Sequence, residues 1–404
     1  MKKVDRWLLP DAIEEMLPEQ ASQVEDLRRR LVNLFKSWGY DYVIPPMLEF
    51  TDSLLAGSDD DIGLLTFKLT DQLSGKMLGL RADITPQVAR MDAHSLKRDG
   101  INRLCYAGHV AHTKPKGPLV SRTPIQVGIE LFGEAGADAD IEVISLLIAT
   151  LEQAGLPEQY VDLGHVGVFR ALSKCAGLSC EQEGALFDLM QVKAFSEIES
   201  WLEAELSDAQ QRRWFLKLPQ FAGSIAVLDE ALDFYADAPA AVSDAIAELK
   251  AVATTLVSRF PEARLYFDLS ELRGYHYLTG IVFGASSPGV GASIATGGRY
   301  DHIGEVFGRS RPATGFAVDL TVVREQVKAE LVEQNAIFAP QVDSPAYWAE
   351  VQALRASGER VICGLGGQAE AFSHQGCNRI LQEHNGGFRV NFIETSKNEP
   401  SQEK

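Results

Sequence analysis

The chain has 404 residues, 46 % hydrophobic and 23 % charged, a composition typical of a soluble protein with a packed core. This length exceeds a single small core and predicts two or three domains. The formal net charge of −18 disfavours a nucleic-acid partner, because phosphate backbones attract clustered Lys and Arg.

The five cysteines form no CxxC pair, and the start MKKVDRWLLPD contains no apolar run long enough for a signal peptide or a membrane span. We therefore expect a cytoplasmic protein with free thiols and no membrane contact. The eight histidines show no metal-ligand spacing with cysteine, so neither a metal nor another cofactor is expected.

The first predicted elements are a helix and a strand. Apolar residues at steps of three and four predict an amphipathic helix over 21–38, ended by Gly39. The segment YDYVIPPMLEF (40–50) has the pattern of a strand, but Pro45 and Pro46 remove two backbone donors. We expect this strand at a sheet edge or at a subunit interface.

Antiparallel strands and helices follow in turn. Strands are predicted over 67–71, 76–83, 102–110 and 124–133. A helix is predicted over 85–97, where Thr85 and Pro86 suit the cap and the first helical position, and another around 138–154. The region from about 170 to 260 is helical throughout.

Strands return over 263–272, 277–286, 292–298 and 314–320, and a short α/β unit begins near residue 330. In that unit we expect a helix over 347–357, a strand over 359–365, a second helix and a strand over 388–393. The order predicts an α+β fold, with a mostly antiparallel sheet flanked by helices. The expected organisation is a core over 1–325 with a helical insertion over about 170–260, a small α/β domain over 330–395 and a polar tail over 396–404.

Three groups of residues are candidates for a site. In LGLRADITPQVAR (78–90), Arg81, Asp83, Thr85 and Gln87 lie at a strand end and could face a pocket, or could belong to a capped helix start with a solvated Arg. In QVGIELFG, the alternating Gln126, Gly128 and Glu130 share one strand face. That face either lines a ligand cavity, where Gln reads an imidazole or amide edge and Glu holds an ammonium, or is a solvated side of the sheet.

The third group combines LRGYHYLTGIVFG (272–284) with TGGRYDHIGEVFG (296–308). Glycines before Arg299 and Tyr300 indicate unusual backbone angles or a close approach to a ligand. Arg273 can grip a carboxylate in a bidentate fork, and a Tyr can fix an imidazole or an amino group.

Across residues 5–325 these motifs resemble, in the same order, the catalytic core of histidyl-tRNA synthetase, a class II aminoacyl-tRNA synthetase. The helix and strand ending in IPPMLEF resemble its motif 1, LRADITPQVAR its LRPEGT segment, and YAGHVAHTK through QVGIELFG its motif 2. RGYHYLTGIVF is similar to the histidine-binding signature RGLDYYTGTVFE, and GGRYD is shared. The resemblance implies a class II fold and self-association through the motif 1-like segment.

The resemblance also implies a histidine pocket. Its residues here would be Asp83, Thr85, Gln126, Glu130, Arg273 and Tyr277. Asp83 replaces a Glu of the family, and His276 and Leu278 replace an Asp and a Tyr.

The ATP site departs further from the family pattern. His112 and Lys114 stand where motif 2 carries a phosphate-binding Arg and an acid, and Asp319 and Val322 stand where the last motif carries Gly-rich backbone and a second Arg. Removing one preorganised donor typically costs about 10² to 10³ in rate. We therefore expect negligible adenylation.

A synthetase-like chain that keeps an amino-acid pocket, loses its ATP chemistry and has a short C-terminal unit resembles the regulatory subunits of ATP phosphoribosyltransferase. That resemblance implies a non-catalytic protein that joins and activates a short-form catalytic subunit at the first step of histidine biosynthesis. Histidine would be its feedback effector, and tRNA would not bind the acidic surface.

Three alternatives stay open. The chain could be a divergent histidyl-tRNA synthetase-like ligase that activates an amino acid with ATP. VICGLGGQAEAF (361–372) could be a nucleotide loop, although GLGG lacks the GxGxxG spacing of such loops and suits a tight turn. The basic run from His94 to Arg122 is either a solvated loop or an anion- or partner-docking surface.

Overall fold

The computed structural model describes residues 8–56, 60–117, 120–156, 159–275, 277–288, 293–327, 335–365 and 376–393. The chain divides into two compact units, 1–327 and 328–404. No helix in these described ranges is long and apolar enough to cross a membrane.

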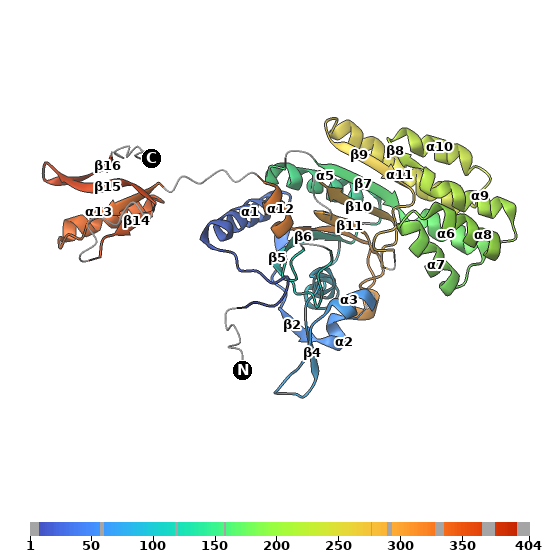
Figure 1. The fold of residues 1–404 in the computed structure, drawn as a ribbon, viewed down its shortest axis with the longest axis horizontal. Helices are drawn as coiled ribbons and strands as arrows, with labels where there is room; N and C mark the ends of the chain where they lie inside the picture. The colour runs from blue at the N-terminus through green and yellow to red at the C-terminus, as the bar shows by residue number, and fades with distance from the viewer. Residues whose placement is uncertain are drawn as a thin grey trace, which may run out of the picture. The chain divides into compact units, whose positions relative to one another are not determined.

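A nine-stranded sheet forms the centre of the first unit, in the order β1-β5-β6-β12-β11-β10-β7-β9-β8 (Figure 1). Neighbouring strands are antiparallel except for β1 with β5 and β7 with β9. The strands are β1 Asp41–Tyr42, β5 Asn102–His109, β6 Ile125–Phe132, β7 Tyr160–His165, β8 Ala222–Gly223, β9 Arg264–Asp268, β10 Ile281–Ser286, β11 Ala295–Arg299 and β12 Ala313–Asp319. This mostly antiparallel sheet confirms the predicted α+β class.

Two long helices, α1 (Pro18–Ser37) and α5 (Ala137–Ala154), cover one face of this sheet (Figure 1). The helix predicted over 21–38 is confirmed, and Gly39 follows its end in the left-handed region at φ 87°. The apolar alternation of β6 points Val127, Ile129 and Leu131 to this covered face, where all three are buried. On the same face the ring of Phe35 from α1 meets Phe316 of β12 edge-on, with centroids 6.0 Å apart.

The helical insertion lies between β7 and β9 and contains α6 to α11, with β8 inside it (Figure 1). Its helices are α6 Val166–Ala176, α7 Cys180–Gln191, α8 Phe195–Glu205, α9 Ala209–Lys217, the short 3₁₀ turn η2 Leu218–Gln220, α10 Ala226–Phe234 and α11 Ala240–Arg259. The sequence spacing predicts one apolar face over 242–260, and in α11 this face is buried from Val242 to Leu256, whereas Phe260 at the C-cap is only partly buried. Two further short helices, η3 Glu305–Phe307 and α12 Leu320–Gln326, flank β12.

The strand predicted over 40–50 is broken in two, which corrects the expectation of a single element. Its first part, β1, lies at the edge of the large sheet, and its second part, β2 (Leu48–Phe50), joins β4 (Met77–Leu80) and β3 (Lys68–Thr70) in a separate sheet. The short helices α2 (Thr51–Leu54) and α3 (Asp60–Leu65) accompany that sheet. The break occurs at Pro45 and Pro46, which cannot donate to a strand ladder.

Two side chains that could face a pocket according to the sequence, Arg81 and Gln87, instead form hydrogen bonds to the backbone at this break. Arg81 donates from Nη1 to the Pro45 carbonyl at 2.8 Å, and Gln87 donates from Nε2 to the Pro46 carbonyl at 2.7 Å. Both side chains are buried. Arg81 and Gln87 therefore face the backbone of residues 45–46 rather than a pocket, and they supply donors to two carbonyls that lie outside the strands.

The helix predicted over 85–97 begins as α4 (Thr85–Arg90) and continues as one π-helical stretch, η1 (Met91–Leu96). Its N-cap is Ile84, without a side-chain hydrogen bond, so the expected capping role of Thr85 is wrong. The Thr85 hydroxyl lies 3.3 Å from the Tyr106 hydroxyl instead.

The second unit holds a four-stranded sheet in the order β14-β13-β15-β16 and helix α13 (Pro345–Ala356). Its strands are β13 Ala336–Ala339, β14 Val361–Cys363, β15 Cys377–His384 and β16 Gly387–Phe392. Sequence analysis missed β13, which has only four residues, and β15, which is largely polar. The expected second helix, and residues 366–372 of the glycine-rich segment, lie outside the described residues.

Candidate functional site

The face of the large sheet opposite α1 and α5, called here the open face, has a floor of glycines. In register across the strands, Glu130 of β6 is paired with Gly315 of β12, and Gly315 with Gly298 of β11. A Cβ on Gly315 would overlap the Glu130 carboxylate, and a Cβ on Gly284 of β10 would overlap the Arg273 guanidinium. The missing side chains therefore let both charged groups lie on the sheet.

Glu130 is only 1 % exposed and is held by two hydroxyls. Tyr106 donates to its Oε1 at 3.1 Å, and Tyr300 donates to its Oε2. Burial raises the pKa of this carboxyl to about 8. The expectation of a solvated sheet face fails at this residue, because its carboxyl is enclosed and mostly protonated at neutral pH.

Asp83, Thr85 and Gln126 continue the network beside Glu130. Gln126 donates from Nε2 to Asp83 Oδ1 at 3.1 Å, and its Oε1 accepts the Ile84 backbone N–H at 3.1 Å. Asp83 Oδ1 also accepts the Thr85 backbone N–H at 3.2 Å. Four of the six residues expected in the histidine pocket thus form one connected group at the β6 side of the open face.

Arg273 and Tyr277 lie at the other side, on the loop 269–280 that joins β9 to β10. Arg273 donates from Nη2 to Glu271 Oε2 at 2.6 Å and lies 3.6 Å from Asp162 Oδ2 of β7. Its Nη1 donates to Ser293. β12 and β11 separate β6 from β10, so the axes of these two strands are about 14 Å apart at three strand spacings of about 4.8 Å. The structure places the six residues on one face in two groups.

The shared GGRYD segment divides between the two faces of the sheet. Tyr300 reaches Glu130, whereas Arg299 lies on the covered face and donates from Nη2 to Asp140 Oδ2 of α5 at 2.6 Å. Sequence analysis missed Tyr106 and Tyr300 as partners of Glu130. Tyr106 could have been found from strand pairing. If strands 102–110 and 124–133 pair in the observed register, Tyr106 lies opposite Gly128, on the same face as Glu130.

The positions expected at the ATP phosphates have local roles in the structure. His112 is buried, with Nε2 at 2.9 Å from the Ala82 carbonyl, and burial lowers the pKa of its ring. Asp319 is the N-cap of α12 and accepts the backbone N–H groups of Thr321 at 2.9 Å and Val322 at 3.4 Å. Lys114 is exposed on the loop after His112.

The basic run from His94 to Arg122 does not form a continuous surface. Arg98 pairs with Asp41 at 2.8 Å and Arg103 with Glu142 at 2.7 Å, so acids from distant segments neutralise part of it. Arg122 donates from Nε to the His112 carbonyl at 2.9 Å. Lys114 and Lys116 remain exposed.

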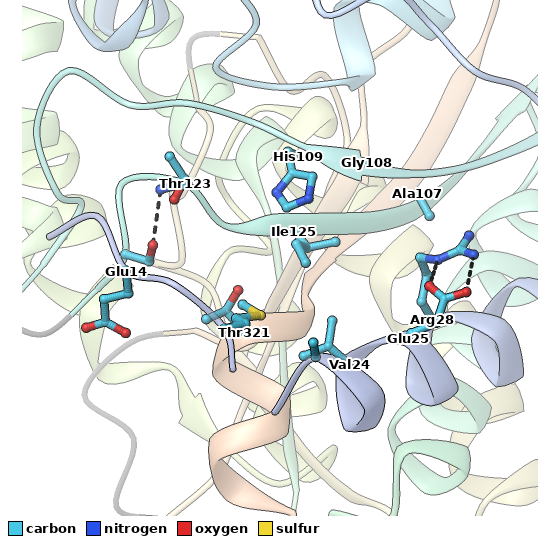
Figure 2. A pocket seen from close by; sticks show the side chains of 13 residues that line it. Glu14, Val24, Glu25, Arg28, Ala107, Gly108, His109, Thr123, Ile125 and Thr321 are labelled. Carbon is cyan, nitrogen blue, oxygen red and sulfur yellow. Dashed lines mark hydrogen bonds and ion pairs between the residues drawn. The ribbon is translucent and has the colours of Figure 1, made fainter. Parts of the chain in front are cut away.

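A cavity of about 500 Å³ lies away from the open face, between α1, the segment before it and the ends of β5 and β6 (Figure 2). Its wall includes Val24 of α1, His109 of β5, Ile125 of β6 and Thr321 of α12. None of the six candidate residues lines this cavity. Within the described residues, no group of three or more His, Cys, Asp or Glu side chains could hold a metal ion.

Each of the two units matches a known family model. Residues 12–323 match the family model described as histidyl-tRNA synthetase. Residues 334–391 match the model described as the ATP phosphoribosyltransferase subunit HisZ C-terminal domain.

Whole-chain relatives agree with these matches. The ATP phosphoribosyltransferase regulatory subunit of Teredinibacter turnerae is 62 % identical over 391 residues, which cover 96 % of this chain and 99 % of the relative. That of Saccharophagus degradans has the same identity and coverage, and that of Cellvibrio japonicus is 57 % identical over 365 residues, 90 % of this chain and 91 % of the relative.

Solved structures share the fold. A crystal structure from Bacillus halodurans, described as an ATP phosphoribosyltransferase regulatory subunit/histidyl-tRNA synthetase, superposes with a TM-score of 0.81 at 27 % identity and covers 92 % of this chain and 97 % of that one. Histidyl-tRNA synthetase from a Nostoc species gives 0.76 at 19 % identity, with 93 % and 91 % covered, which shows a common fold.

Proposed function

Because the chain belongs to the family of ATP phosphoribosyltransferase regulatory subunits, built on a histidyl-tRNA synthetase-like class II core, we propose that it activates a short-form catalytic subunit and makes it sensitive to histidine. Members of this family are non-catalytic subunits of the enzyme that acts in histidine biosynthesis. The catalytic partner condenses ATP with phosphoribosyl pyrophosphate, and histidine is the feedback effector bound on the open face.

The observation that supports this proposal best is the arrangement of charge on the open face. An amino acid carries an ammonium and a carboxylate, and the face offers the Asp83 carboxylate beside the enclosed Glu130 carboxyl at one side and the Arg273 guanidinium at the other. Gln126 lies beside the acids, where an amide can read an imidazole edge. Binding requires rearrangement at both sides, because Glu130 is enclosed by hydroxyls and Arg273 is already paired with Glu271.

The former nucleotide end supports a regulatory role over a ligase. The first free N–H groups of α12 already donate to the Asp319 carboxylate, which occupies the place of a phosphate at this helix end. His112 faces a backbone carbonyl and stays neutral near pH 7, because burial lowers its pKa. Neither side chain offers the preorganised positive charge that phosphate activation requires.

Mixing the two subunits tests the proposed function. The rate of a purified short-form catalytic subunit is measured with and without the full chain, each across a histidine titration. We expect a faster rate on mixing and histidine inhibition that Arg273→Ala weakens. An unchanged rate without co-elution, or histidine-dependent ATP–pyrophosphate exchange by the chain alone, would overturn the proposal in favour of a ligase.

Self-association through the motif 1-like segment is the second part of the proposal. Leu48 and Phe50 of β2, Leu69 of β3 and Leu78 and Leu80 of β4 lie on one face of the three-stranded sheet, by strand register. Leu48, Phe50 and Leu69 are 42 %, 41 % and 39 % exposed, although the opposite face is covered at Gly79 by Leu54 and Thr66. An apolar face of this kind is typical of an interface, and a second copy would cover it.

Sedimentation of the full chain tests this interface. We expect Phe50→Asp to halve the sedimenting mass, because a charge would have to be buried between the copies. Val192→Asp, at an equally apolar exposed position in the helical insertion, is the matched control and should leave the mass unchanged. A Phe50→Asp variant with the wild-type mass would place the interface elsewhere.

A further inference from the structure

The loop 269–280 has two sides. Arg273 and Tyr277 belong to the candidate site on the open face, but Tyr275 between them is only 4 % exposed and enters the helical insertion. Its ring centroid lies 5.4 Å from that of Phe169 in α6 and 5.2 Å from that of Phe187 in α7. A single short segment therefore contacts both the candidate site and the helices.

Polar contacts strengthen this attachment. The Tyr275 hydroxyl donates to Glu183 of α7, and the Arg170 guanidinium of α6 lies 4.8 Å from the Tyr275 ring centroid. Arg170 Nη2 also donates to the backbone carbonyls of Tyr275 at 2.9 Å and Leu278 at 3.1 Å. Both the side chain and the backbone of the loop are therefore bound to α6 and α7.

The loop backbone makes Arg273 and Tyr275 move together. Gly274 has φ 68°, in the left-handed region, and its carbonyl accepts the N–H groups of Tyr277 at 3.1 Å and Leu278 at 2.9 Å. A Cβ on Gly274 would crowd both of those side chains. Because this turn is compact and its inner side is close-packed, a displacement of Arg273 must move the Tyr275 ring against Phe169 and Phe187.

We propose that Tyr275 is a positioning residue that couples histidine on the open face to helices α6 and α7. This inference rests on the proposed function and identifies the residues through which the effect of histidine would reach α6 and α7. An effector carboxylate that draws Arg273 away from Glu271 and Asp162 moves the turn, and Tyr275 passes that movement to the helical insertion. The position or mobility of α6 and α7 then differs between the histidine-free and histidine-bound protein.

The test separates binding from coupling in the full chain. The Kd for L-histidine is measured by calorimetry with and without the short-form catalytic subunit, together with inhibition of the complex at saturating histidine. Tyr275→Leu should leave the Kd of the isolated chain within about threefold and lower the coupling factor by about 2- to 30-fold, the range seen for residues that link two sites. By reciprocity, the effect of histidine on the affinity between the two subunits should fall by the same factor as the shift in Kd that the catalytic subunit causes.

Tyr235→Phe is the matched control. Tyr235 is an equally buried tyrosine of the helical insertion, and its hydroxyl donates to the Trp214 carbonyl at 2.8 Å. This variant loses one hydroxyl hydrogen bond, as Tyr275→Phe does, but should retain full coupling. Amide hydrogen exchange gives a second readout, since histidine should change protection in α6 and α7 of the wild type and of Tyr235→Phe, and much less in Tyr275→Leu.

The outcomes separate this inference from the proposed function. Absence of histidine binding by the wild-type chain would overturn both. Wild-type coupling and exchange in a folded Tyr275→Leu variant would overturn the route through Tyr275 alone. If the Leu variant does not fold, Phe187→Leu decides the question, because it removes the α7 ring that Tyr275 contacts, and wild-type coupling in that variant would overturn the route. Tyr275→Phe keeps the ring, so coupling equal to that of Tyr235→Phe would exclude only a role for the bond to Glu183.

Discussion

The two faces of the large sheet each carry an arginine paired with a carboxylate, in different surroundings. On the covered face the Arg299 side chain is 4 % exposed and its partner Asp140 is fully buried. On the open face the Arg273 side chain is 37 % exposed and its partner Glu271 14 %. The comparison shows that the same kind of ion pair is part of the closed core on one face and is partly open to solvent on the other.

The largest effect on the free energy of unfolding is expected for Arg299→Ala, on the covered face. The substitution leaves the buried Asp140 without its guanidinium partner, which typically costs about 3 to 5 kcal/mol in the free energy of unfolding. Urea-induced unfolding measures this loss. Arg98→Ala removes the exposed pair with Asp41 and should cost less than about 1 kcal/mol. Equal losses in the two variants would contradict the structural role of Arg299.

Glu130→Gln tests the buried carboxyl of the open face through the pH dependence of the free energy of unfolding. The folded carboxyl keeps its proton up to a pKa of about 8, against an ordinary value of 4.5. Between these values the folded state binds more protons than the unfolded state, so this contribution to stability is complete below pH 4.5 and is lost as the pH rises to about 8. A Gln side chain does not titrate, so the Glu130→Gln variant does not lose this stability as the pH rises.

The stability difference, wild type minus Glu130→Gln, should therefore decline with pH by up to about 1.4 kcal/mol per unit. Unfolding by urea at pH 5.5, 7 and 8.5, values spread over roughly the window of this linkage, measures that slope. Parallel pH profiles would show that Glu130 is ionised in the folded protein.

Arg273→Ala should affect binding more than stability, in contrast to Arg299→Ala. Loss of charged hydrogen bonds to the histidine carboxylate should weaken affinity by about 10- to 150-fold, while unfolding changes by less than about 1 kcal/mol because the pair is partly exposed. Calorimetry and urea unfolding give the two values. Arg273→Lys should retain part of the affinity, because Lys supplies a charge without the planar fork. A large loss of stability without a loss of affinity would assign Arg273 to the fold.

The smallest effect is expected at the N-terminus of α12. Asp319→Ala removes the N-cap of α12 and should cost about 1 kcal/mol in unfolding free energy, whereas Asp319→Asn can still cap and should cost less. Urea unfolding of both variants measures the difference. Identical losses would show that charge rather than capping accounts for the contribution of Asp319.

Most helices and strands of the first unit were predictable, because their periodicity is local. The 21–38 helix, the paired strands around 102–110 and 124–133, and the apolar face of α11 follow from residue spacing alone. The strand at 40–50 was predictable as an edge but not as two strands in two sheets, because its second half pairs with β4 and is held by Arg81 and Gln87, all more than 25 residues away. In the second unit, the short β13 and the polar β15 carry no hydrophobic alternation that sequence analysis could use.

Two features were predictable from the sequence alone, namely the α+β class and the alternation that gives β6 one polar and one apolar face. These features depend on residue type and spacing along the chain. Other features became visible only in the folded chain. Arg299 faces α5 while Arg273 lies on the open face, and His112 is buried. Tyr106 and Tyr300 enclose Glu130, and Tyr275 enters the helical insertion. Each of these depends on the register and packing of segments distant in sequence, which set burial and hydrogen-bond partners and which local patterns do not encode.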